Sequence, residues 1–215
     1  MKIWTNTNTL AEYHHQFDIV EDKNLAQIAL LGSKKININE FPNLLGIFRA
    51  GIGKDNVPEK EANENNIKVC YPTAKTIEII FNETSSFTCN LIFKMMYNNI
   101  GTIDPWMKSS RRQLQNKNLL VIGTGNIGRR VFDNMKPFLQ VNGFDLLQNS
   151  INELDSLLKK ADCITLHIPS IPQNKSFLDK EKLKILKKDA ILINTSRGMI
   201  VDENDLFDEF KNDRL

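Results

Sequence analysis

Three glycines with the spacing of a dinucleotide-binding turn follow an apolar run. Gly123, Gly125 and Gly128 come directly after residues 119–122 and precede a stretch with helical periodicity. Each glycine meets a separate steric need: a sharp turn at the first, close approach of a diphosphate at the second, and tight helix packing at the third. A glycine-rich loop without a ligand is the alternative, but the strand before it and the helix after it favour the binding turn.

A carboxylate lies at the distance that this kind of turn requires. The backbone N–H groups of Asn126 and Ile127, with that of the third glycine, would point at the phosphates from a helix N-terminus. Asp145 follows 17 residues after the third glycine, where it can accept both hydroxyls of the adenosine ribose and would repel a 2′-phosphate. Because Leu146 and Leu147 follow it and no arginine does, the sequence predicts NAD rather than NADP as cofactor.

The amino-acid composition is that of an ordinary globular protein. The chain has 215 residues, of which 41% are hydrophobic and 25% charged, so one large or two small globular domains can fold unaided. The formal net charge of +2 is too balanced to indicate a nucleic-acid or membrane partner. The lysines of residues 180–188 are expected on a solvated helix face, so no nucleic acid and no membrane is predicted as a partner.

Cysteine usage and the N-terminus indicate a reducing compartment. Cys70, Cys89 and Cys163 are odd in number and far apart, which argues against disulfides and against a zinc site, so no metal is predicted. Residues 1–5 enter a strand directly, and no apolar run approaches the ~18 residues that span a bilayer. We therefore expect a cytoplasmic protein with buried or half-buried thiols.

Apolar runs alternate with helical patterns, which predicts a parallel, doubly wound α/β fold. Strands are expected at residues 3–5, 29–31, 44–48 and 68–70 in a smaller first unit, and at residues 118–122, 140–144, 162–168 and 190–194 in a second. A short helix is expected at 58–66 and a longer one from 84 to about 98, with a break at 101–105. The predicted domains are therefore residues 1–98 and 99–215.

Ligands of open parallel sheets bind beyond the carboxyl ends of the strands, so the residues that follow each apolar run are the candidates for a binding site. Three strand ends carry polar or glycine-rich segments: residues 49–57, residues 167–169 and residues 194–198. With the glycine turn and Asp145, these segments resemble the D-isomer-specific 2-hydroxyacid dehydrogenases in order and spacing. The sequence Arg-Ala-Gly-Ile-Gly at residues 49–53 is similar to the phosphoglycerate dehydrogenase branch.

The resemblance implies a fold and an activity. It implies a flavodoxin-like substrate domain, a Rossmann NAD-binding domain and a homodimer built through the cofactor domains. The implied reaction is NAD-dependent hydride transfer at C2 of a small D-2-hydroxy or 2-keto acid, with 3-phosphoglycerate as one candidate. Two alternatives stay open: a non-catalytic NAD-binding remnant or corepressor-like NAD sensor, and an NAD-dependent formate dehydrogenase of the same superfamily.

The resemblance also implies residue roles. Arg197 matches the catalytic arginine, whose planar fork suits both a carboxylate and a reacting carbonyl oxygen, although a surface ion pair is the plain alternative. The backbone of Arg49, Ala50, Gly51, Ile52 and Gly53 would hold the substrate carboxylate, unless the segment is only a turn, with Asp55 and Asn56 fixing the loop. The remaining cofactor contacts would come from His167, Pro169, Thr195 and Ser196, of which the last two could instead only cap the loop.

Histidine 167 invites assignment as the proton carrier. The resemblance instead implies that His167 lines the cofactor pocket, and that the proton-transferring histidine and its orienting carboxylate come from segments after residue 198. Neither is found before Leu215, so we expect a fragment of a longer product, with an unpaired sheet edge, that binds NADH and reduces 2-keto acids at most feebly. Residues 71–83 also depart from the family pattern, which leaves the substrate side chain open.

Overall fold

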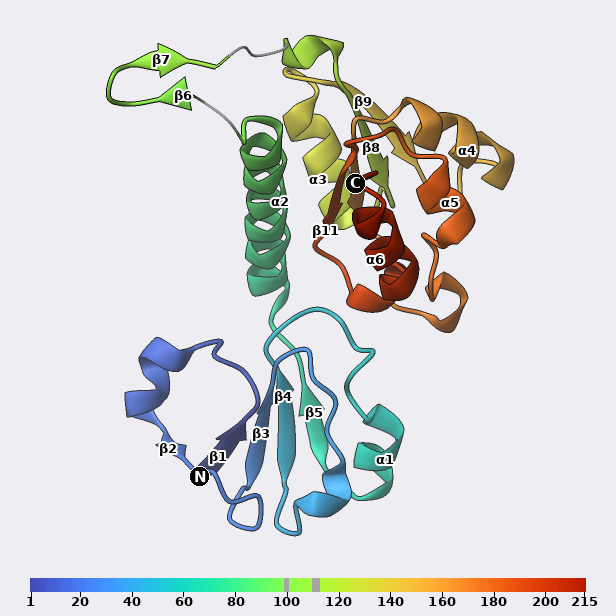
Figure 1. Cartoon of the computed structure of the whole chain (residues 1–215). Helices are drawn as coiled ribbons and strands as arrows, with labels where there is room; N and C mark the ends of the chain where they lie inside the picture. The colour runs from blue at the N-terminus through green and yellow to red at the C-terminus, as the bar shows by residue number, and fades with distance from the viewer. Residues whose placement is uncertain (99–100, 110–112) are drawn as a thin grey trace. The chain divides into compact units, whose positions relative to one another are not determined.

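The structure of the protein is a computed structural model that describes residues 1–98, 101–109 and 113–215. The chain divides into two compact units, Met1–Ile80 and Phe81–Leu215, each with its own parallel sheet (Figure 1). The fold class predicted from the alternating pattern, a doubly wound α/β architecture, is confirmed.

The first unit contains a five-stranded parallel sheet. Its strands are β1 (Lys2–Thr5), β2 (Asp18–Ile19), β3 (Ile28–Leu31), β4 (Gly46–Arg49) and β5 (Lys68–Cys70), in the order β2-β1-β3-β4-β5. This is the strand order of the flavodoxin-like fold. The four predicted strands are confirmed, whereas the two-residue β2 carries no sequence pattern of its own and was not predicted.

One short α-helix and two 3₁₀ turns connect the strands of this unit. They are α1 (Glu59–Glu64) and the turns Ala11–Gln16 and Ile38–Glu40. The core is built from alternate residues of the central strands, including the fully buried Ala29, Leu31 and Ile47, which pack with Ala62 of α1. The sheet thereby holds the loop that follows β4 at a fixed edge.

The second unit contains a four-stranded parallel sheet. Its strands are β8 (Asn118–Ile122), β9 (Gln140–Phe144), β10 (Cys163–Leu166) and β11 (Ile191–Asn194), in the order β11-β10-β8-β9. Its helices are α3 (Asn126–Met135), α4 (Ile151–Lys160), α5 (Lys180–Lys184) and α6 (Glu203–Lys211), with most of α2 (Ala74–Met96). The bounds of β8 and β9 are those predicted, and in β8 an apolar run after Asn118 marks the strand.

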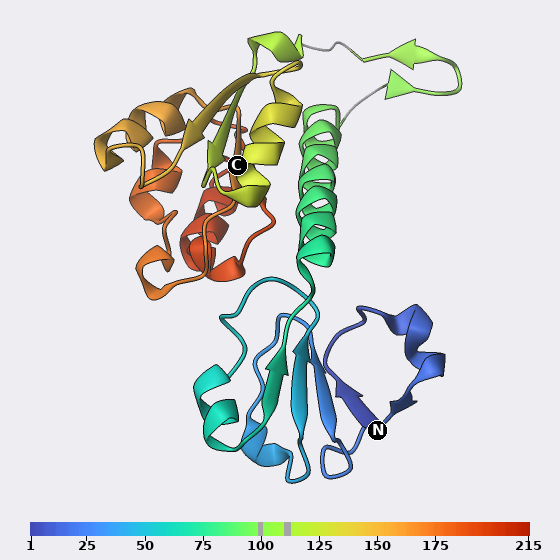
Figure 2. The ribbon, with the colours of Figure 1, turned by 180° about the vertical axis from the view of Figure 1, so that it is seen from behind.

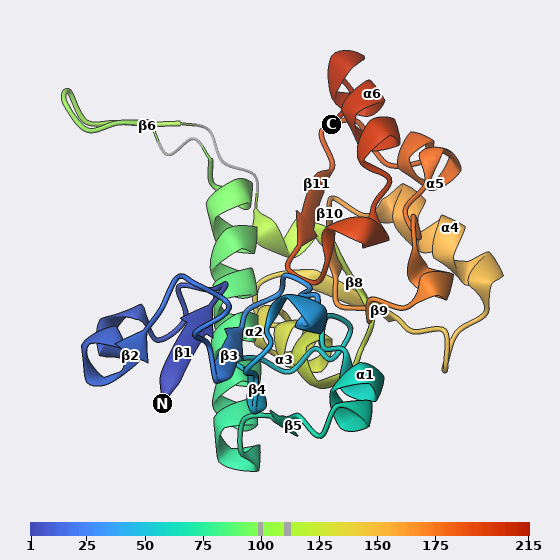
Figure 3. The ribbon, with the colours of Figure 1, turned by 90° about the horizontal axis from the view of Figure 1, so that it is seen from below.

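Alternate side chains of β8 supply two separate cores. Leu119 and Val121 pack with residues of α2 and α3, whereas Leu120 and Ile122 pack with residues of α4 and α5. Figures 2 and 3 show the resulting layers, with α3 on one face of the sheet and α4 and α5 on the other. A strand buried on both faces must be apolar throughout, which explains the unbroken run before the glycine turn.

Helix α2 begins earlier than predicted. The expected helix is present, but its predicted start at Thr84 was wrong, because α2 starts at Ala74, where the Thr73 hydroxyl oxygen accepts a hydrogen bond from the N–H of Thr76 at 3.3 Å. Residues 71–83, which depart from the family pattern, therefore contain the start of a helix. A hairpin of β6 (Gly101–Thr102) and β7 (Met107–Lys108) follows α2 where only a break was expected.

The boundary between the compact units lies inside α2. From Phe81 onward the helix belongs to the second unit, because Ile92 is fully buried there and Cys89 and Phe93 pack against the same core. The predicted boundary between residues 98 and 99 therefore lies later in the chain than the boundary between the two compact units, which follows Ile80. The assignment of one unit to substrate and the other to cofactor stays a prediction.

Two further expectations concern thiols and membranes. Cys163 is buried and Cys70 and Cys89 are half-buried, and none of the three forms a disulfide, as predicted. Burial raises the pKa of the Cys163 thiol to about 12, so that it stays protonated. Across residues 1–98, 101–109 and 113–215, no helix has both the length and the apolarity to cross a bilayer.

Candidate functional site

Two glycines of the turn after β8 have no room for a side chain. Gly123 has a φ of 89°, and a Cβ there would lie 2.7 Å from the backbone carbonyl of His167. A Cβ on Gly128 would lie 1.9 Å from the carbonyl oxygen of Gly123. Both glycines are therefore required by the fold itself, the first for its conformation and the third for the approach of α3 to the strand.

Gly125 differs from its two neighbours in the turn. Its φ is −71°, which any residue can adopt, and a Cβ there would meet no atom within 4 Å. The protein itself leaves this space open, at the position where a diphosphate would approach the backbone. Helix α3 begins at the next residue, and no side chain caps its N-terminus. The N–H groups of its first turn have no partner within the helix and favour an anion, so the residues present fit a diphosphate.

Asp145 lies at the end of β9 and faces the glycine turn. Its Oδ2 accepts hydrogen bonds from the backbone N–H of Thr124 at 3.0 Å and from the Thr124 hydroxyl at 3.2 Å. Its Oδ1 accepts from the N–H of Leu147 at 3.1 Å. The bond from Leu147, followed by those from Thr124, lowers the pKa of this carboxyl below its ordinary value, so that it is ionised at neutral pH.

A small cavity lies beside this carboxylate. It has a volume of about 200 Å³ and is lined by Thr124, Arg129, Phe132, Gly143, Gln148 and Asn149. The one cation among these residues, Arg129, pairs with Asp133 on its own helix, with 2.9 Å between Nε and Oδ2. Leu146 and Leu147 flank the carboxylate with exposed side chains. The surroundings of Asp145 thus suit a ribose diol better than a 2′-phosphate.

The strand register aligns the predicted site residues along one edge of the sheet. Ile122 of β8 pairs with Phe144 of β9 and with Leu166 of β10, which in turn pairs with Asn194 of β11. The four strands therefore end at one level. The chain passes from β8 to β9 on one side and to β10 on the other, so the glycine turn lies at the topological switch point, where open α/β sheets bind ligands.

His167 occupies the end of β10 as a neutral, paired side chain. Its Nε2 lies 3.0 Å from the hydroxyl oxygen of Thr165, which is completely buried. Burial lowers the pKa of His167 to about 4, so the imidazole is uncharged at neutral pH. A neutral imidazole that is hydrogen-bonded to Thr165 is a poor proton donor at pH 7. This property supports the predicted role of His167 in lining the cofactor pocket.

A closed loop carries Arg197 after β11. Asn194 holds it from both sides: its Nδ2 donates to the carbonyl oxygen of Arg197 at 2.7 Å, and its Oδ1 accepts from the N–H and the hydroxyl of Ser196 at 3.0 and 2.6 Å. The Thr195 hydroxyl oxygen lies 3.0 Å from that of Thr88 on α2. The guanidinium of the half-exposed Arg197 donates to the carbonyl oxygen of Ser196 at 3.0 Å.

Asn194 and Thr88 were not predicted as site residues. An asparagine at the end of a strand, the position of Asn194 in β11, often closes a turn with its own side chain, and that signal could have identified it. Thr88 lies 107 residues before Thr195, and no local pattern indicates the contact between them. Pro169, the last predicted cofactor residue, is exposed in the segment after β10, where its carbonyl oxygen accepts from Asn174 at 2.9 Å.

The predicted substrate loop lies in the first unit, after β4. The buried Arg49 side chain donates from Nε to the carbonyl oxygen of Gly53 at 3.0 Å and to Oδ1 of Asn56 at 3.1 Å, so it supports the loop from beneath. Asn56 in turn donates to the carbonyl oxygen of Gly32 at 2.8 Å, which confirms that it fixes the loop. Asn6, which accepts from the N–H of Gly32 at 2.8 Å, joins this network and was not predicted.

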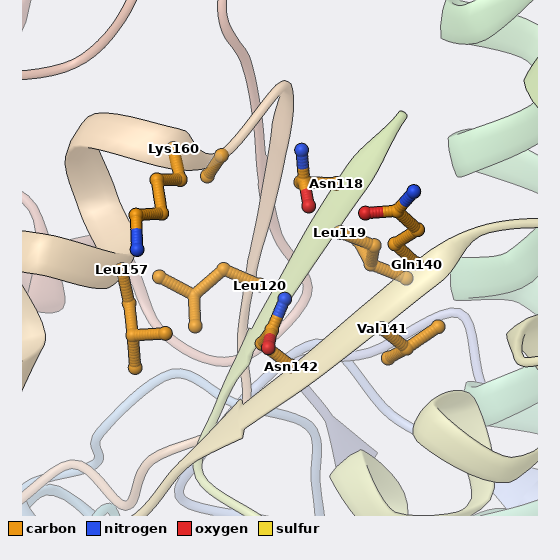
Figure 4. A pocket seen from close by; sticks show the side chains of 9 residues that line it. Asn118, Leu119, Leu120, Gln140, Val141, Asn142, Leu157 and Lys160 are labelled. Carbon is orange, nitrogen blue, oxygen red and sulfur yellow. The ribbon is translucent and has the colours of Figure 1, made fainter. Parts of the chain in front are cut away.

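Another cavity of the second unit lies away from the glycine turn. It has a volume of about 300 Å³ and lies beside the first residues of β8 and β9, where Asn118, Gln140 and Asn142 line it together with Leu157 and Lys160 of α4 (Figure 4). Because it opens at the amino ends of the strands, it does not belong to the site at the carboxyl edge. Within the described part of the chain, no group of three or more His, Cys, Asp or Glu side chains could hold a metal ion.

Comparison with known families identifies this architecture. The profile described as "D-isomer specific 2-hydroxyacid dehydrogenase, NAD binding domain" matches residues 97–215. The match covers more than half of the chain and includes the glycine turn, Asp145 and the loop of Arg197. The chain belongs to the D-isomer-specific 2-hydroxyacid dehydrogenase family and contains its NAD-binding domain, as the sequence motifs predicted.

Two relatives illustrate the similarity in sequence. A D-3-phosphoglycerate dehydrogenase of Methanocaldococcus jannaschii is 29% identical over 198 residues, which are 83% of this chain and 37% of the relative. A glycerate dehydrogenase of Methylorubrum extorquens is 29% identical over 212 residues, 90% of this chain and 66% of the relative. The chain thus spans between about a third and two thirds of the length of these relatives.

Solved structures confirm the fold of the chain. A D-lactate dehydrogenase from Aquifex aeolicus, solved with NAD and lactic acid, has a TM-score of 0.76 at 21% identity and covers 100% of this chain and 74% of its own. A 3-phosphoglycerate dehydrogenase of Entamoeba histolytica, solved with NAD⁺, has a TM-score of 0.72 at 21% identity. The match covers 99% of this chain and 77% of that one.

Proposed function

We propose that this protein is an NAD-dependent oxidoreductase that acts on the CH–OH group of D-2-hydroxy acids. The observation that carries the proposal is the contrast within the glycine turn: the space at Gly125 is open, whereas Gly123 and Gly128 are packed against the protein. Asp145, ionised and hydrogen-bonded to the same turn, supports a ribose beside the diphosphate. Membership of the 2-hydroxyacid dehydrogenase family supports the reaction class.

NAD, when bound, accepts or gives a hydride at its nicotinamide ring. The turn from Gly123 to Gly128 would bind the diphosphate through backbone N–H groups, and Asp145 would bind the adenosine ribose. His167, Pro169, Thr195 and Ser196 would line the cofactor farther along the edge. None of these side chains carries a charge at neutral pH, so this part of the edge suits the uncharged reduced ring.

Arg197 would act on the acid. Its guanidinium can bind the carboxylate and donate a hydrogen bond to the C2 oxygen, which stabilises the negative charge that develops there during ketone reduction. For the loop after β4, a separate proposal is that the backbone N–H groups of Gly51 to Gly53 bind a substrate carboxylate. Asn194 keeps the carbonyl group of Arg197 fixed, and Arg49 and Asn56 keep the glycine loop in shape.

We also propose the finer assignments that the family suggests. The substrate would be a small 2-hydroxy or 2-keto acid, with 3-phosphoglycerate as the first candidate because the relative in Methanocaldococcus jannaschii is a D-3-phosphoglycerate dehydrogenase. The protein would be a cytoplasmic homodimer. These assignments can be tested by gel filtration with light scattering and by fractionation of cells.

The test of the activity is a panel of D-lactate, D-glycerate, 3-phosphoglycerate and formate, each with NAD⁺ and followed by the absorbance of NADH. Formation of NADH from a 2-hydroxy acid and none from formate is the expected result. Formation from formate alone would overturn the proposal in favour of a formate dehydrogenase. NADH binding without any turnover would instead favour a non-catalytic NAD-binding protein.

A further inference from the structure

Helix α2 places one buried hydroxyl against the loop of Arg197. Thr88 is fully buried, and its Oγ1 lies 2.8 Å from the carbonyl oxygen of Thr84 and 3.0 Å from Oγ1 of Thr195. Buried polar groups are rarely retained without a partner, because an unpaired hydroxyl loses its solvation. The hydrogen bonds with Thr84 and Thr195 therefore allow the Thr88 hydroxyl to be buried.

The two distances fix the direction of the hydrogen bonds. Two oxygen atoms at 2.8 Å repel each other unless a proton lies between them, and the carbonyl of Thr84 has none to give. Thr88 must therefore donate to Thr84. A hydroxyl has one proton, so the proton between Thr88 and Thr195 must come from Thr195. The Thr195 hydroxyl thus keeps only acceptor capacity for a ligand.

The position of Thr195 determines which part of a dinucleotide it could meet. Asp145 follows β9 and the glycine turn follows β8, so a dinucleotide that uses both runs along the edge towards β10 and β11. Thr195 follows β11, three strand spacings from β9, or roughly 14 Å at the usual distance between strands. The nicotinamide half therefore lies on the side of Thr195, and its carboxamide carries the N–H groups that an acceptor can bind.

From this arrangement we propose that Thr88 is a positioning residue for the nicotinamide end of the cofactor site. Thr88 accepts the hydrogen bond donated by the Thr195 hydroxyl and thereby leaves the Thr195 oxygen as an acceptor for the carboxamide N–H of the nicotinamide. This inference rests on the proposed NAD-binding function and adds to it a residue outside the cofactor-contacting loops.

Three variants of α2 separate this role from a general effect on the helix. Thr88→Val keeps the shape of the side chain and removes the hydroxyl, and Thr88→Ser keeps the hydroxyl. Ser85→Ala is the matched control, because Ser85 is also buried in α2 and its hydroxyl donates only to the carbonyl oxygen of Asn82, at 2.8 Å. The dissociation constants of NADH and of ADP-ribose, which lacks the nicotinamide, are measured by calorimetry for each chain.

We expect Thr88→Val to weaken NADH binding about fivefold, the usual effect of one lost hydrogen bond, and to leave ADP-ribose binding within roughly twofold. Thr88→Ser should restore NADH binding, and Ser85→Ala should change neither ligand. Should Thr88→Val not fold, Thr195→Val makes the same test from the loop, where the side chain is half-exposed.

Equal weakening of both ligands by Thr88→Val, or no weakening of NADH, would overturn the positioning role. Failure of the proposed NAD-binding function gives a different result. In that case the unaltered chain binds neither NADH nor ADP-ribose, and the positioning role of Thr88 is overturned as well.

Discussion

A Cβ atom added to Gly128 would lie 1.9 Å from the carbonyl oxygen of Gly123, far inside any possible contact distance. This relationship fixes how closely α3 can approach the end of β8 and therefore where the first turn of the helix directs its N–H groups. The cofactor site is thus built by the packing of one glycine on another, five residues apart in the sequence.

Gly128→Ala should destabilise the second unit. The added methyl group must push α3 away from β8, at a cost of about 3 kcal/mol, the upper end of what overpacking of a core costs. The free energy of unfolding, from urea titration followed by circular dichroism, measures the effect. A loss below about 0.5 kcal/mol would show that α3 does not pack on the strand as described.

Asp145→Asn should weaken NADH binding about tenfold and reduce the preference for NADH over NADPH. The charge-assisted hydrogen bonds to the ribose are lost, and so is the repulsion of a 2′-phosphate. Binding of both cofactors is measured by the quenching of tryptophan fluorescence or by calorimetry. An unchanged ratio of the two dissociation constants would contradict the role of Asp145 in cofactor choice.

The lowered pKa of Asp145 predicts the pH range in which its contribution disappears. A carboxyl with a depressed pKa stabilises the folded state above its unfolded pKa of about 3.9, and this stabilisation is lost as the pH falls through the lower folded value. NADH binding that depends on Asp145 should therefore be constant between pH 5 and pH 8. A carboxylate titration within that interval that disappears in Asp145→Asn would contradict the hydrogen bonds from Leu147 and Thr124.

His167 should titrate with a midpoint near pH 4, followed by the imidazole resonances in NMR. Because its pKa is lowered from about 6.5, the unfolded chain binds a proton that the folded chain does not, and stability falls as the pH drops from about 6.5 to about 4. His167→Gln should remove this part of the pH dependence of Tm. A midpoint near 6.5 would show that the imidazole is solvated and available for proton transfer.

Arg197→Lys should lower kcat for oxidation of the preferred D-2-hydroxy acid about 100-fold while leaving the dissociation constant of NADH within twofold. An ammonium group keeps the charge but cannot bind a carboxylate and the C2 oxygen with one planar fork. The matched control is Arg214→Lys, which should change neither quantity, because Arg214 pairs with Glu209 of α6 and is none of the proposed site residues. Equal activity of Arg197→Lys and the unaltered chain would show that the Arg197 guanidinium has no role in the reaction.

The sequence was most informative where packing and local geometry impose the same pattern. The run at residues 118–122 is buried on both faces of a sheet and is followed by glycines that the turn requires, so strand, turn and helix were all predictable. Asp145 was predictable because its distance from the turn is set by one helix and one strand. The strand order of each sheet, by contrast, could not be predicted, because the sequence does not show which strands become neighbours when the chain crosses from one side of the sheet to the other.

Other features depend on contacts between distant parts of the chain. The start of α2 at Ala74 was missed because the stretch Thr76-Ile-Glu-Ile-Ile-Phe81 is rich in β-branched residues and has no strong helix-start signal. Asn6 and Asn56 both form hydrogen bonds with Gly32, and Thr88 contacts Thr195, so these contacts join residues at least 24 positions apart. Only the folded structure brings those side chains together.

The central claim, that the space at Gly125 receives the diphosphate of NAD, is tested most directly by Gly125→Ala. The φ of −71° and the empty surroundings admit the methyl group, so the free energy of unfolding should stay within about 1 kcal/mol of the original. The dissociation constant of NADH should rise at least about tenfold, because the methyl group occupies the place of a phosphate. An unchanged NADH affinity in this folded variant would contradict the account.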